Sequence, residues 1–129
     1  MNKKFLMGTI GVFVSWVLLD YLMHEVILKS AYAATSNLWR PEMNMVLIFV
    51  VTFIAAAAFT FIYAELVGNK STSTALKYGL VWGIGAGVSF AYGTYAVMDI
   101  PYTMALTWFI GTIVEGLAAG YVVSMLVKD

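Results

Sequence analysis

Four long apolar segments, separated by short polar stretches, dominate the pattern of this chain. They cover residues 5–28, 43–67, 76–98 and 103–127. Each is longer than the ~20 helical residues that a hydrocarbon core requires. Lipid offers no hydrogen bonds to the backbone, so segments of this kind cross it as helices. The pattern therefore predicts an all-α fold, a four-helix transmembrane bundle that forms one domain over residues 1–129.

The connections between these segments are short, which predicts sequential helices as antiparallel neighbours in an up-down-up-down order. Basic residues near the segment ends give the orientation, because cytoplasmic ends carry an excess of lysine and arginine. One side holds Lys3, Lys4, Lys70, Lys77 and Lys128. The other side holds Lys29 and Arg40. The excess on the first side predicts that both termini are cytoplasmic.

Small residues recur along the third segment on two nearly opposite faces. One face holds Gly79, Gly83 and Gly87, and the other holds Gly85, Ser89 and Gly93. The fourth segment adds Gly116 and Gly120. Small residues at this spacing let helix backbones approach closely in lipid. The third helix is therefore predicted as the packing centre, with one neighbour on each face, either within the bundle or in another subunit.

Composition supports a membrane protein and argues against several other classes. The chain is 62% hydrophobic and 11% charged, with seven basic and seven acidic residues. The balanced charge argues against nucleic acid as a partner. The sequence contains no cysteine, which excludes disulfides, thiolate metal sites and a cysteine nucleophile. It also contains no phosphate loop, nucleotide fingerprint or nucleophile elbow, so an enzyme is the least supported class.

Ionisable residues inside the apolar segments are the candidate functional groups. An aspartate at the centre of a membrane helix costs about 2.5–3.5 kcal/mol on insertion scales, so such groups usually face the bundle interior and have partners. Asp20 and His24 are four residues apart and share one helix face. Glu115 lies within the fourth segment. Residues of comparable depth complete a predicted polar site of Asp20, His24, Thr52, Ser89, Tyr92 and Glu115.

Three interpretations of this polar site remain open. The first is a satisfied structural cluster in which Glu115 is protonated. The second is a proton or ion relay, since acids and histidines in membranes often mark such paths. The third is a metal site formed by Asp20, His24 and Glu115. Methionines near the outer helix ends extend the third interpretation to copper, because thioethers with a histidine favour Cu(I). These are Met23, Met43, Met45, Met98 and Met104. The sequence identifies no cofactor.

The outer loop carries Trp39 and Arg40, which are typical either of a partner contact or of an anchor at the lipid headgroups. The start Asn2-Lys3-Lys4-Phe5, the loop Asn37-Leu38-Trp39-Arg40-Pro41-Glu42-Met43 and the glycine-rich third segment resemble small four-span bacterial inner-membrane proteins. The resemblance implies the fold and a bacterial inner membrane. It offers no activity or site residues to carry over.

Two functions follow as expectations. The first is a non-catalytic accessory or structural subunit of a membrane complex or homo-oligomer. Its partners would be the lipid bilayer and other membrane subunits or further copies of itself, and its support is the number of small-residue faces. The alternative is a small proton-, ion- or metal-handling membrane protein that uses Asp20, His24 and Glu115.

Overall fold

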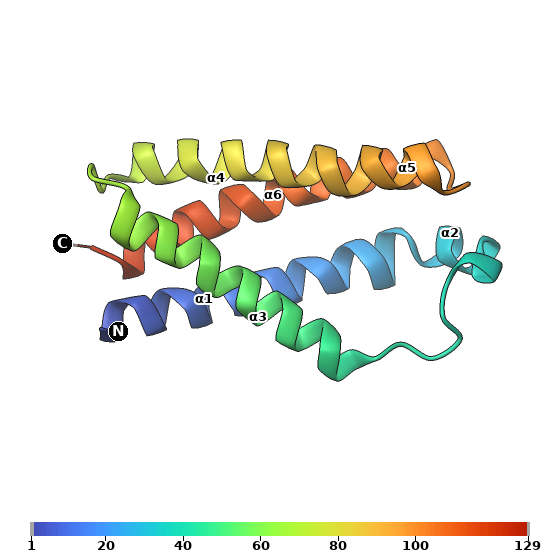
Figure 1. Cartoon of the computed structure of the whole chain (residues 1–129), viewed down its shortest axis with the longest axis horizontal. Coiled ribbons are helices and arrows are strands. Elements are labelled where there is room, and N and C mark those ends of the chain that lie inside the picture. The colour runs from blue at the N-terminus through green and yellow to red at the C-terminus, as the bar shows by residue number, and fades with distance from the viewer. Residues whose placement is uncertain (1, 129) are drawn as a thin grey trace.

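In the computed structural model, which describes residues 2–128, the chain forms four long helical spans and no strand (Figure 1). The spans cover Lys3–Ile27, Met45–Leu66, Thr72–Val97 and Tyr102–Leu126. Each is long and apolar enough to cross a membrane. The predicted all-α four-helix bundle is therefore confirmed.

Three of the spans contain a π-helical segment, and the fourth is a regular α-helix. The elements, in chain order, are α1 Lys3–Asp20, η1 Tyr21–Ile27, α2 Lys29–Ala34, η2 Ser36–Leu38, α3 Met45–Phe61, η3 Ile62–Leu66, α4 Thr72–Gly87, η4 Val88–Tyr92, α5 Gly93–Val97 and α6 Tyr102–Leu126. Single π turns inside α-helices are frequent at functional sites. The apolar pattern gave no sign of them, because a π turn changes the helical period only locally.

Polar residues cap the starts of three helices. The side chain of Asn2 accepts from the backbone N–H of Phe5, and Asn44 accepts from that of Leu47. Ser71 accepts from the backbone N–H of Thr74. Each cap satisfies one of the helix-start donors that lack a partner within the helix. The cap at Ser71 explains why the third span begins at Thr72, earlier than the apolar pattern predicted.

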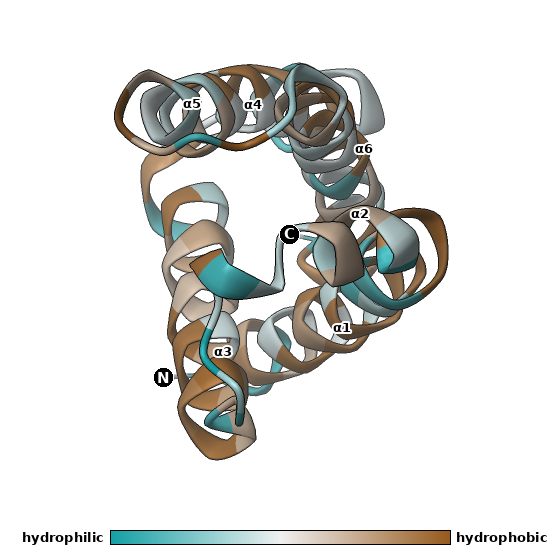
Figure 2. Cartoon of the chain, turned by 90° about the vertical axis from the view of Figure 1, so that its right-hand side faces the viewer, coloured by the Kyte–Doolittle hydropathy of each residue, from teal (hydrophilic) through white to brown (hydrophobic). Residues whose placement is uncertain are grey.

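The spans are arranged in the order α4, α6, α1 and α3 around the bundle (Figure 2). α6 packs against α4 along its length and against α1 on its other side. α3 packs against α1 and crosses the bundle at a steep angle (Figure 1). We call the end with residues 2–4, 67–71 and 127–128 the terminal end, and the end with residues 28–44 and 98–101 the loop end.

α3 and α4 are close only toward the terminal end, although the short connection predicted them as full neighbours. There the hydroxyl of Tyr78 donates to the carbonyl of Phe59 at 2.6 Å, and the Phe59 ring lies 5.2 Å from that of Trp82. Toward the loop end α3 diverges from α4 and α5 (Figure 1). The first two turns of α3 are exposed as a result.

Two separate apolar cores fill the bundle. The core at the terminal end consists of Val12, Trp16, Ala56, Phe59, Tyr63, Ala75, Ala119, Val123 and Val127. The core at the loop end consists of Met23, Leu28, Ala91, Ile100, Met104, Ala105 and Trp108. On α1 and η1, Asp20 falls between Trp16 of the first core and Met23 of the second. On α6, Glu115 falls between Trp108 and Ala119, so both acids lie in the layer that separates the cores.

Glycines bring α4 and α6 into backbone contact. A Cβ added to Gly79 would overlap the carbonyl of Gly116, and one added to Gly83 would lie 2.7 Å from the Cα of Ile113. A Cβ added to Gly120 would overlap the carbonyl of Ala75. This outcome matches the predicted packing face of Gly79, Gly83 and Gly87, and the packing role of Gly116 and Gly120.

The second small-residue face of the third span has no neighbour within the described residues. A Cβ added to Gly85 or Gly93 would meet nothing within 4 Å in that part of the chain, and Ser89 is exposed. Of the two placements that the sequence allowed for this face, packing within the bundle is not observed, and packing against another subunit stays a prediction. The physical reason is that Gly79, Gly83 and Gly87 turn toward α6, and Gly85 and Ser89, two residues away from Gly87 on either side, then point outward.

Candidate functional site

Asp20 and Glu115 form a carboxyl pair between the two apolar cores. Asp20 is the last residue of α1, and Glu115 lies midway along α6. Their carboxyl groups are within hydrogen-bonding reach of each other. The sequence placed both acids in one candidate site without fixing whether they face the same interior, and the structure brings them together.

The backbone around Glu115 is fixed from two sides. The indole N–H of Trp16 donates to the carbonyl oxygen of Glu115 at 2.8 Å and so ties α1 to α6. A Cβ added to Gly111 would overlap the sulfur of Met23, so the absence of a side chain there lets η1 approach α6. Gly116 allows the same close approach to α4. Small neighbours therefore hold Glu115 on a helix that is packed on both sides.

The pair can hydrogen-bond only when it holds a proton, because two ionised carboxylates accept and neither donates. In the ionised form the Oε2 atom of Glu115 is buried with no donor among the described residues. One proton shared between Glu115 and Asp20 removes both this unmet acceptor and the repulsion of two like charges. The geometry is therefore suited to hold and release one proton.

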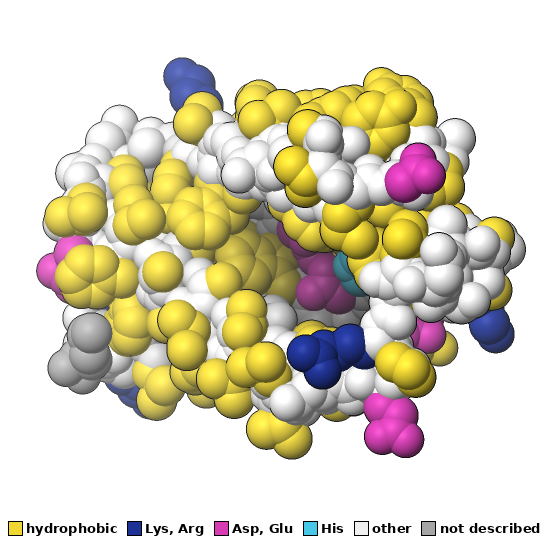
Figure 3. Space-filling model, turned by 45° about the vertical axis from the view of Figure 1, so that its right-hand side comes forward, with side chains coloured by type: hydrophobic (Ala, Val, Ile, Leu, Met, Phe, Trp, Pro, Cys, Tyr) yellow, Lys and Arg dark blue, Asp and Glu magenta, His cyan; other side chains and the backbone are white. Residues whose placement is uncertain are grey.

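A cavity of about 200 Å³ opens beside Asp20, between the end of the first span and the start of α3. Its lining residues are Val17, Asp20, Tyr21, His24, Glu25, Met43, Met45, Ile48, Phe49 and Thr52. Figure 3 shows acidic side chains at the bottom of a hollow, next to the single histidine of the chain. The cavity exists because α3 diverges from the bundle toward the loop end. It gives the Asp20 side of the carboxyl pair a route to that end.

His24 is hydrogen-bonded to Tyr32, which lies on α2. The Nδ1 atom of His24 lies 2.5 Å from the hydroxyl of Tyr32, and the indole N–H of Trp108 donates to the same hydroxyl at 2.7 Å. Because Trp108 can only donate, Tyr32 accepts from it, and the hydroxyl proton is then available for Nδ1 of a neutral His24. The second ring nitrogen of His24 then carries the proton of the imidazole.

Tyr32 keeps its proton because of its surroundings. Burial raises the pKa of Tyr32 to about 12, and the negative charges of Asp20 and Glu25 add to this effect. The N–H of Trp108 acts in the opposite direction. The hydroxyl is therefore neutral at physiological pH and keeps its hydrogen bond to His24. This network links the loop end of η1 to α2 and α6.

The predicted metal site is not formed. Over residues 2–128 no three histidine, aspartate or glutamate side chains gather closely enough to hold a metal ion. Asp20 turns to Glu115, whereas the Nδ1 atom of His24 is occupied by Tyr32. The spacing of four residues placed Asp20 and His24 on one helix face, but it could not show that each has a different partner.

The methionines do not converge on one point. Met43 and Met45 line the cavity together with His24. Met23 and Met104 are instead buried in the core of the loop end. The grouping predicted for copper therefore divides between a cavity wall and a packed interior.

Three polar residues of the predicted site have different surroundings. Thr52 lines the cavity, and its hydroxyl donates to the carbonyl of Ile48 in the preceding turn. The hydroxyl of Tyr92 lies 3.0 Å from that of Tyr102, and Ser89 is exposed. The prediction that Ser89 and Tyr92 join the cluster is wrong, because Gly87 and Ala91 form the buried face of this span.

Trp39 and Arg40 of the outer loop have different surroundings. The indole N–H of Trp39 donates to the hydroxyl of Thr35, and its ring lies 5.4 Å from Tyr32 and 6.2 Å from Trp108. Trp39 is therefore part of the packing at the loop end, where it stays partly exposed, and its role as a partner contact stays a prediction. Arg40 is exposed.

Sequence reasoning missed three residues that support the site, namely Trp16, Tyr32 and Trp108. A signal was present, because an indole N–H or a phenol hydroxyl within or beside a membrane span needs a hydrogen-bond partner. Aromatic residues near span ends are usually read as interface anchors. That reading places Tyr32 at the membrane surface and says nothing of its contacts with His24 and Trp108.

Comparisons with protein-family models, with curated proteins and with solved structures found no match to this chain. The assignment of a function therefore depends on the geometry of the site.

Proposed function

We propose that this protein is a small proton-coupled membrane carrier or proton-binding membrane protein whose working group is the Asp20–Glu115 pair. The observation that carries the proposal is a carboxyl pair, placed between two apolar cores, beside a cavity that leads to the loop end of the bundle. Intramembrane acids that are paired and face a cavity usually mark proton or ion paths.

The packed side chains between the carboxyl pair and the terminal end support a carrier rather than a continuous channel. Between the carboxyl pair and the terminal end lie Trp16, Phe59 and Tyr63, all buried. The cavity next to Asp20 opens toward the loop end, and neither acid lines the cavity at the terminal end. A proton bound from the loop end would then cross only if α3 and its neighbours rearranged, as in alternating access.

The test is proton uptake by purified protein in liposomes that contain a pH-sensitive dye. Glu115→Gln keeps the size of the side chain and removes its acidic proton. We expect the wild type to move protons in response to an imposed pH gradient and Glu115→Gln to reduce the rate at least about tenfold. Glu65→Gln is the matched control, because Glu65 is exposed on η3 and away from the cavity.

Infrared spectroscopy gives a second readout that does not depend on transport. A carboxyl pair that holds a proton contributes the carbonyl band of a protonated acid at neutral pH. This band is expected in the wild type and in Glu65→Gln, and it is expected to disappear in Glu115→Gln. A wild type without the band and without proton movement would exclude the proposal.

A second candidate function, assembly into a homo-oligomer or with other membrane subunits, is favoured by the outward face of Gly85, Ser89 and Gly93. Within the described residues nothing lies near Gly85 and Gly93, so another helix has room to approach closely there. Light scattering in a gentle detergent tests this candidate. Gly85→Leu should reduce the assembled mass, whereas Gly68→Leu, at an equally open position outside this face, should not. A wild type that is monomeric under these conditions and transports protons would exclude assembly.

A further inference from the structure

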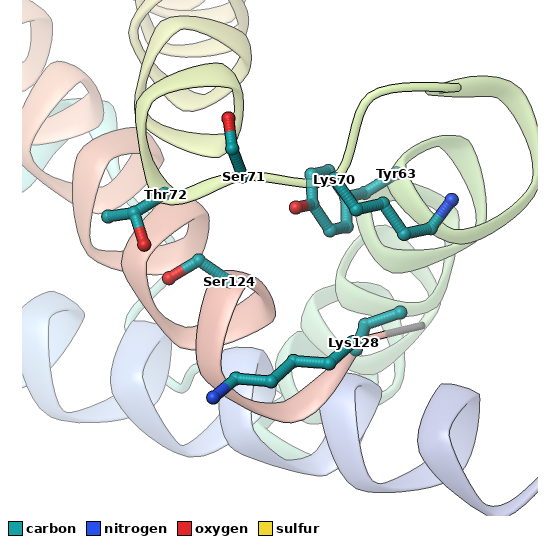
Figure 4. Close-up of a pocket in the computed structure, with 7 residues that line it drawn as sticks. Tyr63, Lys70, Ser71, Thr72, Ser124 and Lys128 are labelled. Atoms are coloured by element: carbon teal, nitrogen blue, oxygen red, sulfur yellow. The ribbon is translucent and has the colours of Figure 1, made fainter.

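A second cavity, of about 340 Å³, lies at the terminal end of the bundle, far from the carboxyl pair. The loop before α4, the start of α4 and the last turn of α6 surround it (Figure 4). Its lining residues are Tyr63, Lys70, Ser71, Thr72, Ser124, Val127 and Lys128. The proposed proton-binding function uses none of these residues.

The charge of this cavity is positive. Two lysines line it, and none of the described residues in its lining is acidic. Lys4 brings a third ammonium group to the same end, because its Nζ donates to the carbonyl of Lys128. Asp129 lies outside the described residues. Basic pockets between transmembrane helices on the cytoplasmic side are typical binding sites for phosphate-bearing headgroups.

The ammonium of Lys70 is held by weak, neutral partners. It donates to the carbonyl of Val67 at 2.8 Å and lies 5.8 Å from the ring centre of Tyr63. A hydrogen bond to a phosphate oxygen is roughly twice as strong as one to a neutral acceptor. The four-carbon stem of lysine lets the ammonium change partner without moving the backbone. Figure 4 shows the side chains of Lys70 and Lys128 extending in opposite directions from the cavity, so both ammonium groups would turn inward to reach one phosphate.

The start of α4 supplies a second, independent attraction for an anion. Ser71 caps this helix by accepting from the N–H of Thr74, and the first turn contains no acidic residue. The N–H groups of Thr72 and Ser73 at the helix start have no partner within the helix. Helix starts attract phosphate groups for this reason. Thr72 and Ser124 both line the cavity, and their hydroxyls point toward each other (Figure 4).

From the cavity, the two lysines and the N–H donors of α4 that the Ser71 cap does not satisfy, we infer that the terminal end binds a phosphate group. That group is carried either by an anionic phospholipid or by free inorganic phosphate. Lys70 and Lys128 neutralise its charge, and the N–H groups at the start of α4 and the Thr72 hydroxyl donate to its oxygens. The cavity is large enough for one phosphate group, and the apolar surfaces of the surrounding helices would accommodate the chains of a lipid.

The test uses the full chain and two separate probes. Native mass spectrometry with dioleoyl phosphatidic acid measures lipid binding, with dioleoyl phosphatidylcholine as the comparison lipid. Isothermal calorimetry with inorganic phosphate measures binding of the free anion. The variant K70Q/K128Q removes both charges and keeps most of each stem. Lys77→Gln is the matched control, because Lys77 is exposed near the same end but does not line the cavity.

We expect one molecule of phosphatidic acid per protein, at least about tenfold weaker binding in K70Q/K128Q, and no change in Lys77→Gln. Phosphatidic acid bound without inorganic phosphate identifies a lipid as the source, and phosphate bound with the same loss in the double variant identifies the free anion. The inference is overturned if neither probe binds, or if Lys77→Gln weakens binding as much as K70Q/K128Q does. Unchanged circular dichroism of the variants establishes that each is folded.

Discussion

The hydroxyl group of Tyr32 connects α2 to η1 and to α6 at the loop end. It accepts from Trp108 and is hydrogen-bonded to His24, so its loss would leave the N–H of the buried Trp108 and the ring nitrogen of His24 without these partners. An unmet buried donor costs about 1–3 kcal/mol. The sequence places Tyr32 near the end of the first span but does not show this role, because the partners are eight and 76 residues away.

Alkaline pH is expected to weaken the fold through Tyr32. Its pKa is about 12 in the folded protein and 10 for a free tyrosine. The unfolded chain therefore loses this proton first as pH rises. The contribution of Tyr32 to stability is complete below pH 10 and is lost as pH rises from 10 to about 12. Thermal unfolding in one detergent, measured across this range, should show the loss.

Tyr32→Phe separates this effect from the titration of the seven other tyrosines among the eight in the chain. The variant keeps the ring and is expected to melt at a lower temperature than the wild type below pH 10, because Trp108 loses its acceptor. The difference between the two proteins should become smaller toward pH 12. A difference that stays constant over the whole range would show that the Tyr32 hydroxyl titrates alike in both states.

At the scale of elements, the third span has two small-residue faces with opposite environments. Both faces have the same spacing, so the sequence alone could not tell which one packs. The backbone contact decides it, because Gly79 lies against Gly116 while Gly85 meets nothing within 4 Å among the described residues. The positions and lengths of the helices were predictable from the apolar pattern. Their rotations were not, since in lipid the outward face is as apolar as the inward one.

Gly79→Ala is expected to destabilise the bundle, because the new Cβ would overlap the backbone carbonyl of Gly116, which cannot move without displacing α6. Added methyl groups in a packed interior cost about 1–3 kcal/mol. Gly85→Ala is the control, and it should leave stability unchanged or raise it by up to about 1 kcal/mol through helix propensity. Circular dichroism melts of the two variants measure the contrast. Equal losses in both would contradict the packing of α4 on α6.

At the scale of the whole molecule, two ends with different chemistry lie on either side of a divided core. The loop end holds the cavity beside Asp20, and the terminal end holds the cationic cavity with Lys70 and Lys128. The excess of lysines at one end was predictable from the sequence, because the lysines lie near the ends of the apolar segments. The carboxyl pair was predicted only in part. Helical rise gave the depths of Asp20 and Glu115, whereas the divergence of α3 that opens the cavity depends on tertiary packing.

The excess of lysines at the terminal end predicts that this end faces the cytoplasm. The chain has no cysteine, so single introduced cysteines report its orientation directly. Asn37→Cys lies on the loop end and Ser73→Cys on the terminal end, and both native residues are exposed. We expect a membrane-impermeant maleimide to label Asn37→Cys in intact cells, and to label Ser73→Cys only after the cells are permeabilised.

Ala119→Cys is the control for access, because Ala119 is fully buried in the core of the terminal end and should resist labelling in the folded protein. Early labelling of Ser73→Cys with protection of Asn37→Cys would reverse the orientation. The cavity beside Asp20 would then open toward the cytoplasm, and a phosphate group at the terminal end would come from the opposite leaflet. The order in which the two cysteines are labelled therefore shows from which side of the membrane the carboxyl pair can exchange its proton.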